Sequence, residues 1–149
     1  QIKGVKKAFV TVHCGLGAFR EIDVEDLTKH RMDSEQMKAS PELVEQVNSA
    51  KDRGKRVCAI GTSVLRAITT ADSMGGHMKT YDGWTNKFIF PPYDFGVCTD
   101  LVTNFHMPYS TMLMMAAAFG GYDLVMKAYE IAIEEKYRFG CYGDAMLII

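Results

Sequence analysis

Residues 40–68 constrain the fold most, because helix and strand signals alternate there within a short distance. Ser40 and Pro41 are typical of a helix start, and Gly54 follows the basic last turn of the same segment. Arg56–Ile60 is a short apolar run of the buried-strand type, and the residues after its glycine turn return to helical spacing. Helix, strand, tight turn and helix in this order predict an α/β fold.

The rest of the chain continues this alternation. Strands are predicted at 9–13, 88–90, 101–106 and 145–149, and helices are predicted after Ser110 and Asp123. The stretch 21–38 is predicted to cover the surface as a short helix or a connecting strand, and 73–83 reads as a polar loop. We therefore expect residues 1–149 to form a Rossmann-like α/β domain portion, a mostly parallel sheet with helices on both faces.

Composition limits the classes of function. The chain has 149 residues, and a net charge of -1 argues against a generally basic nucleic-acid binder. No apolar run reaches the length of a membrane span, and the N-terminal sequence lacks the pattern of a signal peptide. The four cysteines have no zinc-site spacing, which predicts buried, reduced thiols, no metal and a cytoplasmic location.

The candidate functional residues lie just after each predicted strand, because ligands of open α/β sheets bind beyond the carboxyl ends of the strands. Gly15 and Gly17 either serve a bend or let a ligand approach the backbone closely. Gly61 and Thr62 lie between a strand and a helix, where the turn either caps the helix or favours an anion.

Three polar residues follow other strands. His106 and His13 could act as acid or base near neutral pH, or they could satisfy turn carbonyls. Asp144 precedes the last apolar strand and could be a carboxylate base or the cap of a turn. Position alone does not separate these alternatives.

Four longer motifs together resemble one family, the S-adenosylmethionine:tRNA ribosyltransferase-isomerases of queuosine biosynthesis. They run in order through nearly the whole chain: Val10-Thr11-Val12-His13-x-Gly15-x-Gly17-x-Phe19, Met32-x-Ser34-Glu35, Val102-Thr103-Asn104-Phe105-His106-x-Pro108-x-Ser110-Thr111, and Glu135-Lys136-Tyr137-Arg138-Phe139-x-x-Tyr142-Gly143-Asp144-Ala145-Met146. The last two motifs are long and specific.

The resemblance implies a larger protein and a definite reaction. Family members have an α/β domain and a β-barrel-like domain, so this chain would correspond to the C-terminal part and lack the barrel. The family transfers and isomerises the ribosyl group of S-adenosylmethionine onto the 7-aminomethyl-7-deazaguanine wobble base of tRNA. The product is epoxyqueuosine, and adenine and methionine are released. S-adenosylmethionine and precursor-bearing tRNA are thus the implied substrates.

That chemistry requires a base beside the sulfonium, a donor for the departing adenine, and recognition of a flipped base. The resemblance assigns these roles to residues of the quoted motifs and of the turn at Gly61 and Thr62. The expected catalytic residues are His106, His13, Asp144 and Glu35. The expected residues for orientation and S-adenosylmethionine binding are Asn104, Ser110, Gly15, Gly17, Gly61 and Thr62.

The chain also departs from the family pattern. Gly61-Thr62-Ser63-Val64-Leu65-Arg66 stands where Gly-Thr-Thr-Ser-x-Arg is usual, and Met32-Asp33-Ser34-Glu35 stands where Met-His-Ser-Glu is usual. Ala18 stands where Thr is common, and Phe90-Pro91-Pro92 replaces Tyr-Pro-Gly. Two alternatives therefore stand beside the enzyme: a divergent paralogue that binds RNA or a nucleotide without catalysis, and another nucleotide-binding α/β enzyme.

Overall fold

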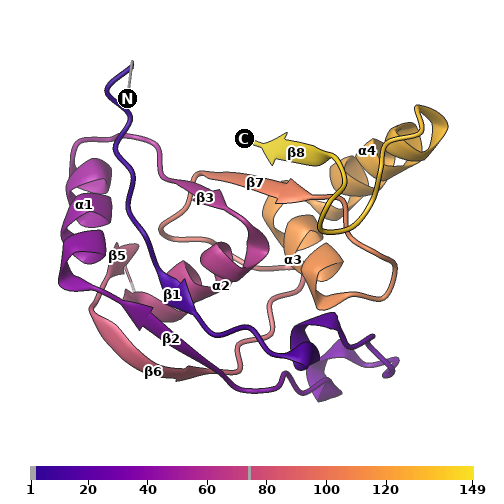
Figure 1. The fold of residues 1–149 in the computed structure, drawn as a ribbon, viewed down its shortest axis with the longest axis horizontal. Helices are drawn as coiled ribbons and strands as arrows, with labels where there is room; N and C mark the ends of the chain where they lie inside the picture. The colour runs from indigo at the N-terminus through magenta and orange to yellow at the C-terminus, as the bar shows by residue number, and fades with distance from the viewer. Residues whose placement is uncertain (1–2, 74) are drawn as a thin grey trace.

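The computed structural model describes residues 3–73 and 75–149 and has a mixed α/β architecture (Figure 1). Within these residues the chain forms two three-stranded sheets, one two-stranded hairpin and four α-helices. The predicted α/β class is therefore confirmed.

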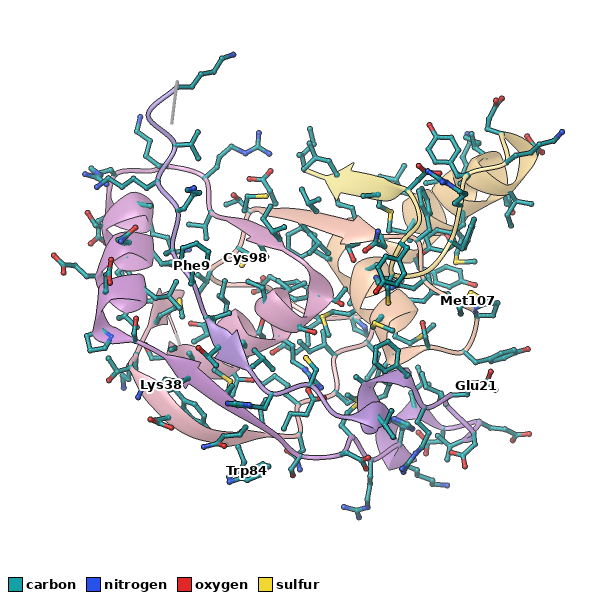
Figure 2. All side chains as sticks on the ribbon, viewed as in Figure 1. Phe9, Glu21, Lys38, Trp84, Cys98 and Met107 are labelled. Carbon is teal, nitrogen blue, oxygen red and sulfur yellow. The ribbon has the colours of Figure 1, made fainter. Side chains whose placement is uncertain are left out.

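The first sheet is antiparallel, and its middle strand is β2 (Glu35–Ala39). This strand pairs with β1 (Thr11–Val12) on one side and β6 (Tyr81–Thr85) on the other. Alternate side chains of β2 are buried, from its first residue to its last, as expected for a sheet with one covered face. Trp84 is 64% exposed and projects from β6 at the lower margin of Figure 2.

The second sheet is mixed. β3 (Cys58–Ile60) and the central strand β7 (Asp100–Asn104) are parallel, whereas β8 (Ala145–Ile148) pairs with β7 in the antiparallel sense. The short strands β4 (Asp72–Ser73) and β5 (His77–Met78) form a separate antiparallel hairpin.

The helices begin where side-chain caps or glycine turns allow. They are α1 (Pro41–Asp52), α2 (Thr62–Ala71), α3 (Thr111–Gly120) and α4 (Tyr122–Glu134). Ser40 Oγ accepts a hydrogen bond from the N–H of Leu43 at 3.3 Å, and Ser110 Oγ accepts one from the N–H of Leu113 at 3.1 Å. Each bond satisfies a first-turn donor that has no partner within its own helix. Between β1 and β2 the chain makes two 3-10 turns, η1 (Leu16–Phe19) and η2 (Leu27–Lys29).

Helix α2 is central to the core and contacts strands of both three-stranded sheets (Figure 1). Leu65 on this helix is fully buried, together with Met37 of β2, Ala59 of β3 and Leu101 of β7. These side chains belong to one apolar cluster, so burial against a shared helix holds the two sheets together. A smaller cluster joins the end of β7 to α3 and α4.

The predicted mostly parallel sheet is wrong for the described residues, in which β3 and β7 form the sole parallel pair. The expectation of helices on both faces also fails for the second sheet. Ile60 of β3 and Leu147 of β8 are both in register with Val102, yet they are 64% and 61% exposed. One face of this sheet is therefore open.

Two further expectations need correction. Phe88–Phe90 is not a strand, although Ile89 is fully buried. Its apolar residues enter the core as an irregular segment, ahead of two prolines that cannot donate to a strand ladder. Of the four free cysteines, Cys98 alone is buried; Cys14, Cys58 and Cys141 are exposed.

Candidate functional site

The carboxyl ends of β3 and β7 lie side by side because the two strands are parallel neighbours. Gly61, directly after β3, donates its N–H to the carbonyl of Val102 in β7 at 2.7 Å. The start of α2 therefore lies beside the end of β7 (Figure 1). This is the sheet edge at which the sequence predicted the site.

The start of α2 has no side-chain cap among the described residues. Gly61 has φ +100°, a conformation that favours glycine, and a Cβ built there would meet nothing within 4 Å. No side chain of the described residues caps the helix, and Thr62 at its first position is buried. The first-turn N–H groups therefore lack a capping side chain from the described part of the chain, and uncapped N–H groups at a helix start are suited to binding an anion.

A buried ion pair lies close to this turn. Arg66 Nη2 contacts Glu35 Oε2, and their side chains are only 3% and 4% exposed. The other carboxylate oxygen, Glu35 Oε1, accepts the N–H of Gly15 at 2.8 Å. Burial lowers the pKa of Arg66, but a guanidinium keeps its proton in proteins, and the paired carboxylate compensates its charge. One carboxylate thus fixes both a helix and a loop.

The sequence indicates Glu35 as a candidate but gives no functional role to Arg66 or Cys14. Cys14 Sγ lies 3.5 Å from Ser63 Oγ, which brings the segment after β1 to the first turn of α2. Arg66 could have been found by its place one helical turn after Thr62, because it is the one charged residue of this helix and needs a partner if it is buried.

The two glycines of the early loop differ in their surroundings. A Cβ at Gly15 would meet nothing within 4 Å, whereas a Cβ at Gly17 would lie 2.2 Å from Asp33 Oδ2 and 2.6 Å from Asp33 Cβ. Gly17 is therefore needed for packing against Asp33. Gly15 has room beside it for another group.

A second group of predicted residues surrounds the end of β7. His106 is buried, and its ring Nε2 lies 2.7 Å from Thr103 Oγ1. The backbone N–H of His106 donates to Tyr129 Oη at 2.8 Å. Burial lowers the pKa of the His106 imidazole to about 4, so the ring is neutral at pH 7.

Asn104, Asp144 and Ser110 bind mainly to backbone groups. Asn104 Nδ2 donates to the carbonyls of Gly143 at 3.2 Å and Asp144 at 3.3 Å, and Asp144 Oδ2 accepts the N–H of Arg138 at 2.7 Å. Ser110 caps α3 and donates to the carbonyl of Met107 at 2.7 Å. These contacts hold the turn before β8 and the start of α3 in place.

The structure thus divides the predicted residues into two groups. Gly15, Glu35, Gly61 and Thr62 gather around the start of α2, and His106, Asn104, Asp144 and Ser110 gather around the end of β7. His13 lies on the first segment with its side chain exposed, and its backbone N–H donates to the carbonyl of Gln36 at 2.9 Å.

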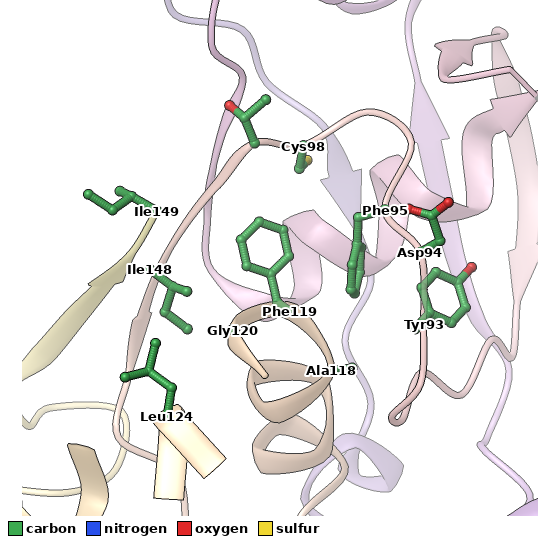
Figure 3. Close-up of a pocket in the computed structure, with 11 residues that line it drawn as sticks. Tyr93, Asp94, Phe95, Cys98, Ala118, Phe119, Gly120, Leu124, Ile148 and Ile149 are labelled. Atoms are coloured by element: carbon green, nitrogen blue, oxygen red, sulfur yellow. The ribbon is translucent and has the colours of Figure 1, made fainter. Parts of the chain in front are cut away.

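Two cavities lie elsewhere. One, of about 330 Å³, is bounded by Phe95, Cys98, Phe119 and Ile148 among others, near the start of β7 (Figure 3). The other, of about 340 Å³, lies between α4 and β8 and includes Ile131. Neither cavity is lined by any of the predicted site residues.

Residues 3–73 and 75–149 show neither a membrane-spanning helix nor a metal-binding cluster. No helix there is long and apolar enough to cross a membrane. In the same residues, His, Cys, Asp and Glu side chains do not gather in groups of three or more that could hold a metal ion.

Replacing Gly17 by alanine should destabilise the chain, because the new Cβ would collide with the stem of the Asp33 side chain. We expect a loss of about 1–3 kcal/mol in the free energy of unfolding, measured by urea titration. Gly15→Ala is the matched control, and its effect should stay within about 0.5 kcal/mol. Equal effects of the two substitutions would contradict the contact with Asp33.

The buried neutral state of His106 should make stability depend on pH. The unfolded imidazole gains a proton near pH 6.5, whereas the folded one remains neutral until about pH 4. The unfolded state therefore binds more protons in this window. The contribution of the neutral His106 ring to the free energy of unfolding is complete above pH 6.5, and it falls by on the order of 3 kcal/mol by pH 4.

Urea unfolding between pH 7.5 and 4 tests this dependence. His106→Gln should remove this loss and so show a shallower fall in stability than the unsubstituted chain, while His13→Gln, at an exposed histidine, should follow the unsubstituted chain. The same pH dependence in His106→Gln and in the unsubstituted chain would rule out His106 as its source.

Comparison with known proteins identifies a matching family and several relatives of the chain. Residues 1–148 match the family described as Queuosine biosynthesis protein. The S-adenosylmethionine:tRNA ribosyltransferase-isomerase of Parabacteroides distasonis is 67% identical over 149 residues, which are 100% of this chain and 43% of that protein. The protein of the same name from Flavobacterium psychrophilum is 55% identical over the same shares, 100% and 43%.

A solved structure agrees with this assignment. The S-adenosylmethionine tRNA ribosyltransferase of Thermotoga maritima superposes with a TM-score of 0.73 at 43% identity, covering 77% of this chain and 40% of that one. The chain spans less than half the length of these relatives. From the match over residues 1–148 and these identities, the chain belongs to the queuosine biosynthesis protein family.

Proposed function

We propose that this chain supplies the S-adenosylmethionine-binding part of a cytoplasmic S-adenosylmethionine:tRNA ribosyltransferase-isomerase. The reaction transfers and isomerises the ribosyl group of S-adenosylmethionine onto 7-aminomethyl-7-deazaguanine in tRNA, giving epoxyqueuosine, adenine and methionine. The names of the relatives support this proposal. The observation that carries it is the buried Glu35–Arg66 pair beside the uncapped start of α2.

The contacts of the acid–base candidates suggest different duties. Glu35 is buried in an ion pair with Arg66, and its other oxygen accepts the N–H of Gly15, so it suits positioning better than proton abstraction. Asp144 accepts a backbone N–H, and His106 is enclosed. His13 has an exposed ring on the segment that leads to Gly15, and we assign proton transfer to it.

The remaining residues then have supporting roles. Gly15, Gly61 and Thr62 would let S-adenosylmethionine approach the backbone, and Gly17 would shape the same loop. Asn104 and Ser110 would orient substrate groups indirectly, by fixing the turn before β8 and the start of α3. A tRNA base would be recognised with the part of the longer protein that lies outside these 149 residues.

The test uses a full-length enzyme in which this chain replaces the matching 149 residues of the Parabacteroides distasonis relative. With S-adenosylmethionine and precursor-bearing tRNA, the chimera should release adenine, quantified by chromatography. Glu35→Gln should lower the rate about 100-fold by misplacing Gly15 and α2, whereas Glu42→Gln on the exposed side of α1 should not change it.

A chimera that binds tRNA but releases no adenine, beside an active parent enzyme, would contradict the proposal. That result would favour the alternative of a non-catalytic paralogue that binds RNA or a nucleotide.

A further inference from the structure

The first turn of α2 offers hydrogen-bond donors that the helix does not use. The helix ladder begins with the N–H of Leu65, which donates to the carbonyl of Gly61 at 3.1 Å. The N–H groups of Thr62, Ser63 and Val64 precede that bond, so they have no partner within the helix. The helix dipole adds partial positive charge at this end of a helix of ten residues.

Arg66 gives a second and independent indication of a ligand. Its side chain is 3% exposed, and while Nη2 pairs with Glu35, Nη1 is buried with no hydrogen-bond partner among the described residues. A buried donor left unpaired costs about 1–3 kcal/mol, and more when it is charged. A binding group that accepts from Nη1 would recover this cost.

The Arg66 guanidinium lies toward the same end of α2. Long side chains on a helix run back toward its N-terminus, and Arg66 comes one turn after Thr62. Glu35, which pairs with Arg66, also accepts the N–H of Gly15 at 2.8 Å, so the Cys14–Gly15 segment lies near the guanidinium. Cys14 Sγ is itself 3.5 Å from Ser63 Oγ in the first turn.

We infer that Arg66 Nη1 and the first turn of α2 bind the carboxylate of the S-adenosylmethionine amino-acid group. The inference rests on the proposed function and assigns one part of its substrate to one set of donors. A guanidinium edge and backbone N–H groups are suited to a planar oxyanion.

A carboxylate fits this place better than a phosphate of the tRNA backbone. Arg66 is almost wholly enclosed, and a carboxylate at the end of a flexible chain can reach it, whereas a phosphodiester carries a ribose on each side. Glu35 already compensates the charge of Arg66. The attraction that remains comes from the partial positive charge at the start of α2, and it suits a single negative charge. Because Arg66 Nη1 is buried, the exposed Cys14–Gly15 segment must move before the carboxylate can reach it.

The test compares two ligands that differ by one group, S-adenosylmethionine and its decarboxylated analogue. Calorimetry on the chimera described above should show S-adenosylmethionine binding at least about 10-fold more tightly. Arg66→Lys keeps a charge opposite Glu35 but loses the second guanidinium nitrogen, and it should reduce this preference to below about 3-fold. Arg53→Lys, at an exposed position, should retain the full preference.

Ser63→Pro removes one of the free N–H groups in the first turn of α2, where a helix tolerates proline, and it should weaken S-adenosylmethionine binding more than binding of the analogue. Equal affinities for the two ligands, with adenine still released, would overturn this inference alone. Absence of both S-adenosylmethionine binding and adenine release would overturn the proposed function as well. Competition by inorganic phosphate that depends on Arg66, without a preference for the carboxylate, would assign the site to phosphate.

Discussion

The buried ion pair between Glu35 and Arg66 is the interaction on which the arrangement of the site depends. Glu35 is the first residue of β2, the middle strand of the antiparallel sheet, and Arg66 is on α2, which packs against both sheets. Removing one partner of such a pair leaves an uncompensated buried charge and typically costs about 3–5 kcal/mol. The same carboxylate holds the backbone of Gly15, so sheet, helix and loop share one anchor.

This anchor explains why the two groups of predicted residues differ. Around the start of α2, Glu35 and Arg66 satisfy most of each other's charge, while backbone donors and one guanidinium nitrogen keep capacity for a ligand. Around the end of β7, Asn104, Asp144 and Ser110 already bind backbone groups. The first group is therefore suited to binding, and the second to holding the strand ends that shape it.

Local signals were enough for the helices. The cap at Ser40 and the glycine turn before α2 lie within a few residues of the elements that they start, so the sequence predicts them directly. Strand β6 begins in the stretch predicted as a polar loop, and β2 lies mostly in the stretch left open between a short helix and a connecting strand. These two strands pair across a long separation, from Glu35 with Thr85 to Ala39 with Tyr81. Their polar alternation has meaning only once that partner is known.

The errors in topology and in the site have the same origin. The parallel expectation failed because β8 returns beside β7 in the opposite direction, a choice that alternation of helix and strand does not determine. Glu35 was found through motif resemblance, but its pairing with Arg66 joins segments 31 positions apart and arises from tertiary packing. By contrast, the choice of the edge at which β3 and β7 end, where the candidate residues Gly61 and Asn104 lie, follows from the general rule for strand ends.

A double-mutant cycle on Glu35 and Arg66 tests whether this ion pair anchors the site. The free energies of unfolding of the unsubstituted chain, Glu35→Gln, Arg66→Met and the double variant would be measured by urea titration. If the pair anchors the site, the double variant should lose at least about 2 kcal/mol less than the sum of the two single losses. If the two single losses sum to the loss of the double variant within about 0.5 kcal/mol, the two residues act independently, and the pair is not the anchor of the site.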